Sequence, residues 1–152
     1  MLEYKGLFFK ESISAEEIQK QVARVAQEIN ADYAGKEPLF VCVLNGAFMY
    51  ASDLMKHISL PAEITFVRLK SYEGTETTGK VNMLIPLQVD VKGRDVIVVE
   101  DIVDTGITMR AFMNNLREMG ATSVALTSFL YKPESLRYEE VKPKYYGLAI
   151  PP

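Results

Sequence analysis

Residues 95–108 read DVIVVEDIVDTGIT, and this stretch decides the fold. It contains four consecutive aliphatic residues, Val96–Val99, which predict a strand buried on both faces, as in a parallel sheet. We expect this strand to end in two adjacent carboxylates, Glu100 and Asp101. From Ile107 the apolar residues recur at helical spacing, so a helix should follow at once. The stretch therefore predicts one strand-loop-helix unit of an α/β domain.

The same alternation continues on both sides of this unit. Ser14 and Glu17 have the spacing of a capping box, and apolar residues recur at helical spacing after them. We expect helices at residues 14–34, 47–58 and 107–119, strands at residues 39–44, 63–70, 81–87, 95–100 and 123–130, and a short apolar run at residues 145–150. This pattern predicts an α/β fold with a mainly parallel central sheet flanked by helices.

The composition fits one ordinary folded domain. The chain has 152 residues, of which 48% are hydrophobic and 24% charged, so disordered, collagen-like and disulfide-scaffold classes are excluded. It carries 17 basic and 20 acidic residues, and the resulting net charge of −3 gives no overall positive field for nucleic acid. Any anionic ligand must therefore be held locally.

Cysteine content and hydropathy indicate the compartment. The single cysteine, Cys42, lies in the apolar run at residues 39–44, so we expect it in the core rather than in a disulfide. No apolar stretch approaches the ~20 residues that span a bilayer, and the N-terminus has no targeting pattern. We expect a single cytoplasmic domain over residues 1–152, without membrane or nucleic-acid partners.

The residues after the central strand suit a sugar phosphate. Thr105, Gly106 and Thr108 place backbone N–H groups and two hydroxyls at a helix N-terminus, which favours binding of a phosphate monoester. Glu100 and Asp101 offer hard oxygen ligands for sugar hydroxyls or Mg²⁺. The alternative is that these acids are merely solvated and that the loop only caps a helix. We favour the ligand site because both features follow one buried strand without a gap.

Resemblance to a known family rests first on residues 98–108, VVEDIVDTGIT. This stretch resembles the phosphoribosyl-pyrophosphate (PRPP) signature of type I phosphoribosyltransferases, and its EDIVDTG form is similar in particular to hypoxanthine-guanine phosphoribosyltransferases. Further matches follow in the expected order at VLNGAFMYASDL (43–54), SYEGTETTGKV (71–81), SFLYK (128–132) and YYGLAIP (145–151). The resemblance implies the type I phosphoribosyltransferase fold with a small hood region.

The resemblance also implies roles for the acidic stretch. The 5′-phosphate of PRPP would be held by Asp104, Thr105, Gly106, Ile107 and Thr108. Glu100 and Asp101 would approach the ribose hydroxyls and the Mg²⁺ cofactor. Asp104 would lie near N7 of the purine and act as the general base while the purine attacks C1′.

Purine and pyrophosphate contacts are implied as well. Ile102 would lie against the base, and Lys132 would donate to the oxygen at C6, although a solvated lysine is the alternative. Pyrophosphate would bind the backbone of Leu44, Asn45 and Gly46, where the family often has a non-proline cis peptide and where a simple turn is the alternative. Many members have lysine where this chain has Asn45, and Arg137 would supply part of the lost charge.

Two further segments follow from the resemblance. Ser71 and Tyr72 would contact pyrophosphate and begin a mobile loop, about residues 71–80, that closes over the reacting centre and excludes water. Family members usually continue past the segment matching residues 149–151 with an aromatic that stacks on the purine and a Mg²⁺-binding aspartate. Since this chain ends at Pro152, we expect its base-binding segment to be truncated.

The function implied is purine salvage. A hypoxanthine/guanine phosphoribosyltransferase would convert Mg-PRPP and a 6-oxopurine into IMP or GMP and pyrophosphate, as a homodimer or homotetramer. Within the same class, a xanthine or pyrimidine phosphoribosyltransferase is the alternative. A PRPP-sensing regulator that binds nucleic acid is disfavoured by the net charge of −3, and an inactive structural paralogue stays open.

Overall fold

The protein is built on a six-stranded sheet. The computed structural model describes residues 2–9, 12–70 and 82–152, so the predicted loop with Ser71 and Tyr72 lies outside the described residues. In spatial order the strands are β5 (Met83–Ile85), β4 (Glu63–Leu69), β3 (Leu39–Leu44), β6 (Asp95–Val103), β7 (Ser123–Tyr131) and β8 (Tyr145–Ala149). Only β5 pairs antiparallel, against β4, and the other neighbours pair in parallel. The α/β prediction is confirmed.

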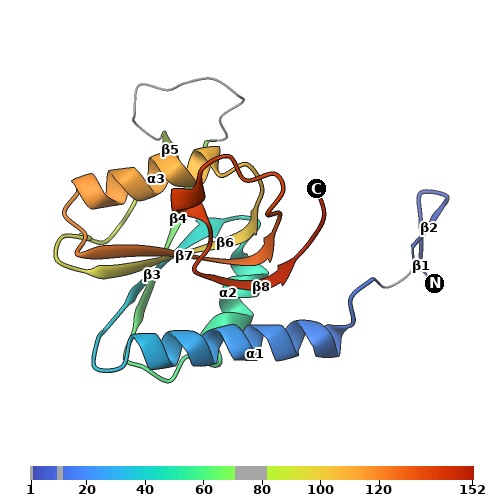
Figure 1. Cartoon of the computed structure of the whole chain (residues 1–152), viewed down its shortest axis with the longest axis horizontal. Helices are drawn as coiled ribbons and strands as arrows, with labels where there is room; N and C mark the ends of the chain where they lie inside the picture. Colours follow the sequence, from blue (N-terminus) through green and yellow to red (C-terminus); the bar gives the residue numbers. More distant parts are fainter. Residues whose placement is uncertain (1, 10–11, 71–81) are drawn as a thin grey trace.

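Helices cover both faces of the sheet. α1 (Ala15–Asp32) and α2 (Phe48–Met55) lie on one face and α3 (Ile107–Glu118) on the other (Figure 1). Val96 and Val98 of β6 pack into the cluster on the α3 side, and Ile97 and Val99 pack into the cluster under α1 and α2. All four side chains are fully buried, as the aliphatic run predicted.

The first helix begins as its sequence predicted. The Ser14 hydroxyl accepts a hydrogen bond from the Glu17 N–H at 3.0 Å and caps α1. Val22, Val25 and Ile29 are its buried apolar positions. Among the helices of the described residues, none is long and apolar enough to cross a membrane.

The single cysteine belongs to the core. Cys42 is fully buried in β3, and burial raises the pKa of its thiol to about 12. A thiol with so high a pKa is a poor nucleophile at neutral pH. Its burial in the cluster under α1 and α2 confirms the predicted place of Cys42 in the core.

Several boundaries differ from the prediction, most of them by one or two residues. β6 does not end at Glu100 but continues to Val103, because Glu100, Ile102 and Val103 keep pairing with β7. The second helix ends at Met55 instead of residue 58, and the strand expected at residues 81–87 is described only over Met83–Ile85. The polar stretch after Lys132 contains one short 3₁₀ helix, η1 (Glu139–Val141).

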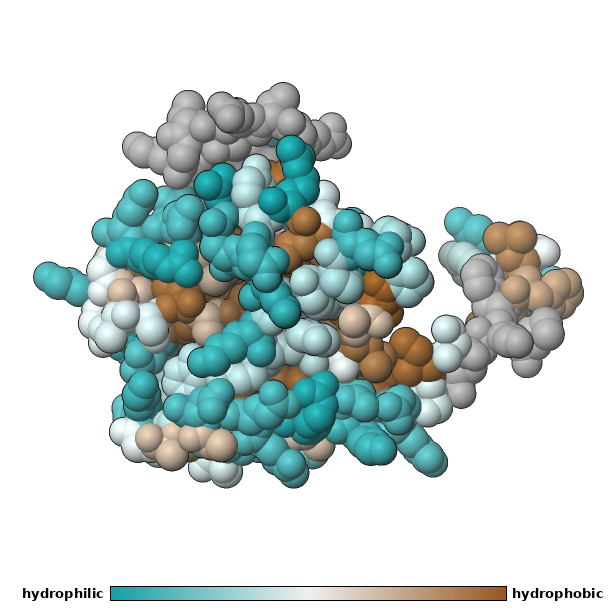
Figure 2. Space-filling view, in the orientation of Figure 1, coloured by the Kyte–Doolittle hydropathy of each residue, from teal (hydrophilic) through white to brown (hydrophobic). Residues whose placement is uncertain are grey.

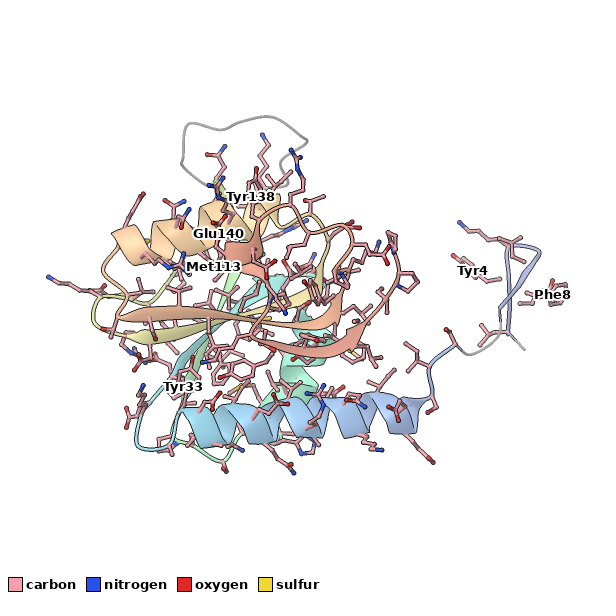
Figure 3. All side chains as sticks on the ribbon, viewed as in Figure 1. Tyr4, Phe8, Tyr33, Met113, Tyr138 and Glu140 are labelled. Carbon is pink, nitrogen blue, oxygen red and sulfur yellow. The ribbon has the colours of Figure 1, made fainter. Side chains whose placement is uncertain are left out.

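An N-terminal hairpin was not predicted. β1 (Leu2–Tyr4) and β2 (Leu7–Phe9) pair antiparallel, and the turn between them has positive φ at Lys5 (50°) and Gly6 (76°). Leu2, Tyr4, Leu7 and Phe8 are all more than 60% exposed. Figure 2 shows apolar surface on this hairpin, and Tyr4 and Phe8 extend from it (Figure 3). Strands of three residues are too short to carry a readable alternation.

Candidate active site

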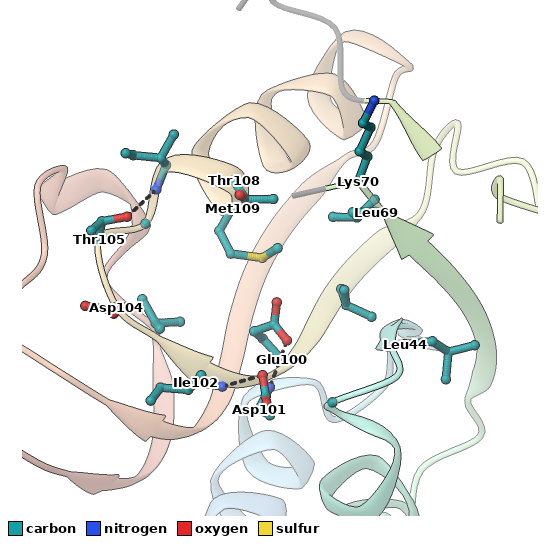
Figure 4. A pocket seen from close by; sticks show the side chains of 15 residues that line it. Leu44, Leu69, Lys70, Glu100, Asp101, Ile102, Asp104, Thr105, Thr108 and Met109 are labelled. Carbon is teal, nitrogen blue, oxygen red and sulfur yellow. Dashed lines mark hydrogen bonds between the residues drawn. The ribbon is translucent and has the colours of Figure 1, made fainter. Parts of the chain in front are cut away.

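A cavity of about 500 Å³ opens at the carboxyl ends of β3, β4 and β6. Parallel α/β sheets bind ligands at this edge, where strands end and helices begin. The cavity is lined by every residue from Glu100 to Met109, together with Val43, Leu44, Gly46, Leu69 and Lys70 (Figure 4). The acidic pair and the phosphate-type loop singled out in the sequence therefore share one cavity.

The loop before α3 has a conformation that requires glycine. Gly106 caps α3 with φ of 87°, and a Cβ at this position would lie 2.6 Å from Cγ2 of Val141. The first intrahelical bond runs from the Arg110 N–H to the Gly106 carbonyl at 2.9 Å, so the N–H groups of Thr108 and Met109 have no acceptor within the helix. These donors face the cavity end of α3, where the helix dipole favours an anion.

The two acids lie within β6. The Asp101 N–H donates to Oε1 of Glu100 at 3.0 Å, and the Ile102 N–H donates to Oδ1 of Asp101 at 2.8 Å (Figure 4). Burial raises the pKa of Glu100 to about 8, and the side chain of Asp101 beside it adds to this rise. A cation or a hydrogen-bond donor bound here would relieve that cost.

The two carboxylates suit a Mg²⁺ ion for which substrate and water provide most of the ligands. Among residues 2–9, 12–70 and 82–152, no group of three or more Asp, Glu, His or Cys side chains could enclose a metal. Two neighbouring carboxylates on this cavity fit the way Mg²⁺ is usually bound, through one or two acids and substrate oxygens. The donor set therefore fits Mg²⁺ held together with its substrate.

The loop after β3 comes very close to the acids. The Leu44–Asn45 peptide is cis, as the resemblance implied. A Cβ at Gly46 would lie 2.5 Å from Oδ2 of Asp101, so a side chain at this position would collide with the carboxylate. Leu44 and Gly46 line the cavity, whereas Asn45 is not one of the residues that line it.

Of the two predicted base-binding residues, Ile102 lines the cavity and Lys132 does not. Nζ of Lys132 lies 3.8 Å from Oδ2 of Asp104, which lines the cavity. Asp104 is 55% exposed and Lys132 24% exposed. Arg137 does not line the cavity, but its backbone N–H donates to the Thr105 carbonyl at 2.9 Å.

Sequence reasoning missed the residues that support the phosphate-type loop. Val141 of η1 is buried, and its side chain and that of Leu136 occupy the space beside Gly106. Lys70 and Met109 also line the cavity. Only Lys70 carried a signal, because it is the last residue of the strand predicted at residues 63–70, at the same edge of the sheet.

The fold and the site together define a phosphoribosyltransferase. The chain belongs to this family, since the family model described as "Phosphoribosyl transferase domain" matches residues 11–149. This match confirms the family resemblance of residues 98–108.

The individual relatives specify which branch of the family the chain resembles. A hypoxanthine-guanine phosphoribosyltransferase of Lactococcus lactis is 36% identical over 140 residues, which cover 91% of this chain and 75% of the relative. A hypoxanthine-guanine-xanthine phosphoribosyltransferase of Tritrichomonas foetus is 34% identical over 135 residues, covering 89% and 74%. The crystal structure of a hypoxanthine-guanine phosphoribosyltransferase from Bacillus anthracis superposes with a TM-score of 0.86 at 35% identity, covering 94% of this chain and 82% of that one.

Proposed function

We propose that this protein transfers the phosphoribosyl group of PRPP to hypoxanthine or guanine, giving IMP or GMP and pyrophosphate. One observation carries the proposal. Glu100 and Asp101 share a cavity of about 500 Å³ with the loop from Asp104 to Thr108. This arrangement matches a ligand with a phosphate at one end and a polyhydroxyl ring beside it. We infer a purine as the second substrate from the names of the relatives given above.

PRPP is expected to lie along the cavity from α3 to the end of β3. Its 5′-phosphate would accept hydrogen bonds from the first-turn N–H groups of α3. Its ribose hydroxyls would donate to Glu100 and Asp101. The raised pKa of Glu100 disfavours an unpartnered charge on that side chain, which a donor would relieve. Pyrophosphate would face the backbone of Leu44–Gly46, with Arg137, Ser71 and Tyr72 as further candidates. Mg²⁺ bound with the substrate at Glu100 and Asp101 would neutralise the negative charge of the leaving pyrophosphate.

Asp104 and Lys132 are suited to the purine itself. Their charged ends lie 3.8 Å apart, so they can meet two neighbouring atoms on one edge of a base. On a 6-oxopurine that edge carries N7 and O6. Asp104 would exchange a proton at N7 as the base attacks C1′ and the bond from C1′ to pyrophosphate breaks. Lys132 would donate to O6, whereas adenine presents an amino group there, and Ile102 would pack against the ring.

A panel of bases with labelled PRPP and Mg²⁺ tests the assignment. We expect hypoxanthine and guanine to give nucleotide product with the highest kcat/KM, and adenine, uracil and orotate to give at least about a hundredfold less, because their edges do not match the Lys132 donor. Preferred turnover of a pyrimidine would overturn the proposal. Binding of nucleic acid at physiological salt without any transfer would show a regulator instead.

Xanthine is the second candidate for a substrate. The relative from Tritrichomonas foetus is named for xanthine as well as for hypoxanthine and guanine. Xanthine has the same N7 and O6 edge and differs at C2, so Asp104 and Lys132 do not separate it from guanine. Its rank in the same panel shows how far this chain shares the wider range.

A further inference from the structure

A second cavity, of about 340 Å³, lies at the other end of the elements that form the active site. The active-site cavity is lined by the start of α3, whereas the second is lined by its later residues Met113 and Arg117. The second cavity also takes in Ser123–Leu126, where β7 begins, and Asp32, where α1 ends. A volume of this size falls within the range of small-ligand sites.

The wall formed by β7 is an uncovered strand edge. β8 pairs with β7 only from Thr127 onward, so Ser123–Leu126 have β6 on one side and no strand on the other. The Lys144 N–H donates to the Leu126 carbonyl at 2.9 Å and marks the point where β8 begins to follow β7. Figure 3 shows Tyr33 and Met113, which both line the cavity, on opposite sides of the sheet. The cavity therefore lies at the edge of the sheet between two layers of helices.

The charges around this cavity are unbalanced. It is lined by four cationic side chains and two acidic ones, namely Lys36, Arg117, Lys142, Lys144, Asp32 and Glu140. Both acids already have partners: Asp32 accepts a hydrogen bond from the Tyr145 hydroxyl at 2.6 Å and lies 4.0 Å from Nζ of Lys144, and Glu140 pairs with Arg110 at 3.1 Å. Within the described part of the chain, Lys36, Arg117 and Lys142 have no carboxylate within ion-pair distance. Their side-chain partners there are neutral: Arg117 donates to Oδ1 of Asn114 at 3.0 Å, and Nζ of Lys36 lies 5.8 Å from the centre of the Tyr33 ring. Three cations without a carboxylate partner among the described residues thus line one cavity in a chain whose net charge is −3.

We propose that this second cavity binds a small phosphorylated polyanion, such as the triphosphate moiety of a metabolite. Several phosphate groups in a row match cations that approach from three segments, namely the loop after α1, α3 and the segment after η1. The concave shape favours a compact ligand over a peptide strand, because the free edge of β7 is only four residues long. The site is separate from the active-site cavity, since the two share no lining residue.

Two methionines of α3 report on the two cavities independently. Met113 lines the second cavity and Met109 the active-site cavity, and both side chains are almost fully buried. We would label the methionine methyl groups of the full chain with ¹³C, assign Met113 with Met113→Leu, and titrate inorganic tripolyphosphate at physiological salt without Mg²⁺. The titration is repeated with the double variant Arg117→Gln/Lys142→Gln. Lys20→Gln serves as the control, because Lys20 is an exposed lysine on α1 that does not line the cavity.

The expected result is a saturable shift of the Met113 signal. The apparent Kd for tripolyphosphate should rise about tenfold or more in the double variant and stay unchanged in Lys20→Gln. An unchanged Met109 titration in the double variant would show that this protein is still folded and that its active site is intact. A shift of Met113 that does not saturate, or that weakens equally in Lys20→Gln, would overturn the proposal. A glutamate-rich peptide that shifts Met113 at lower concentration than tripolyphosphate would also overturn it.

Discussion

The two halves of the active-site cavity are built differently. The half proposed for the 5′-phosphate and ribose depends on backbone conformation, with Gly106 at a positive φ against Val141 and Gly46 against Asp101. The half proposed for the purine depends on the side chains of Asp104 and Lys132, which are 55% and 24% exposed. In the binding mode proposed above, packing fixes where PRPP lies, whereas a few side chains select the base. Variants should separate these two contributions.

The largest effect is expected for Asp104→Asn. Removing the proton acceptor should lower kcat by about 10²- to 10⁴-fold, while the Kd for PRPP changes by less than about threefold, since the backbone donors remain. Steady-state kinetics with hypoxanthine and calorimetric titration with PRPP measure the two quantities. Asp90→Asn is the control, because Asp90 is exposed and asparagine can still accept the hydrogen bond from the Lys92 N–H. Unchanged turnover in Asp104→Asn would remove Asp104 from the mechanism.

Gly106→Ala tests the backbone half. The new Cβ would meet Val141 at 2.6 Å and force alanine to φ of 87°, so we expect a loss of about 2–4 kcal/mol in the free energy of unfolding. The KM for PRPP should rise by about tenfold or more, because the phosphate loop must shift. Urea unfolding and PRPP-dependent kinetics give both numbers.

Gly35→Ala is the matched control for this variant. Gly35 has a similar φ of 79°, but nothing lies within 4 Å of its missing Cβ, so we expect a loss of only about 1 kcal/mol. Adding Val141→Ala to Gly106→Ala should recover part of the PRPP affinity. An equal cost in the two glycine variants would mean that the contact with Val141 does not matter.

Glu100→Gln should alter the pH dependence of stability. The pKa of Glu100 is about 8 in the folded protein against an ordinary 4.5, so the folded state holds a proton that the unfolded state has released. Wild-type stability should therefore fall as pH rises from about 5 to about 8, and Glu100→Gln should not show this part of the fall. At about pH 8 we expect the free energy of unfolding of the variant to exceed that of the wild type by about 2 kcal/mol. At about pH 5 the two free energies should be roughly equal.

Urea unfolding without Mg²⁺ and PRPP measures this difference. Glu118→Gln is the control, because Glu118 is exposed at the end of α3. A wild-type advantage that grows with pH would contradict the buried, proton-holding state of Glu100.

The smallest effect is expected for Lys132→Gln. The glutamine amide can still donate to O6 but can also accept from an amino group, so the preference for hypoxanthine over adenine should fall by roughly tenfold. The ratio of the two kcat/KM values measures this, with Lys56→Gln as a control at an exposed lysine. The KM for PRPP should stay the same. A change in that KM without a change in base preference would assign Lys132 to the phosphate half.

Much of the fold could be predicted because its signals are local. The cap at Ser14 and the aliphatic run at Val96–Val99 each need only a few neighbouring residues to be recognised. The continuation of β6 to Val103 could not be predicted, since it depends on pairing with β7, about 28 residues away along the chain. The hairpin at residues 2–9 was missed although Lys5-Gly6 is a turn signal, because each strand is three residues long.

The candidate site was predictable to a similar degree. One continuous segment, residues 100–108, supplies most of the cavity wall and is recognisable in the sequence. The packing of Leu136 and Val141 against Gly106 could not be recognised in the sequence. These two residues lie in a polar stretch without periodicity and contact Gly106 only in the folded chain. The roles of Asn45 and Arg137 stay predictions, and Ser71 and Tyr72 lie outside the described residues.

Product stoichiometry tests the central claim most directly. The wild-type chain is incubated with hypoxanthine, PRPP and Mg²⁺, and IMP and pyrophosphate are quantified over time. The account predicts one IMP for each pyrophosphate, and release of pyrophosphate at least about a hundredfold slower when hypoxanthine is replaced by adenine. Pyrophosphate released without nucleotide, or nucleotide formed as readily from adenine, would contradict it.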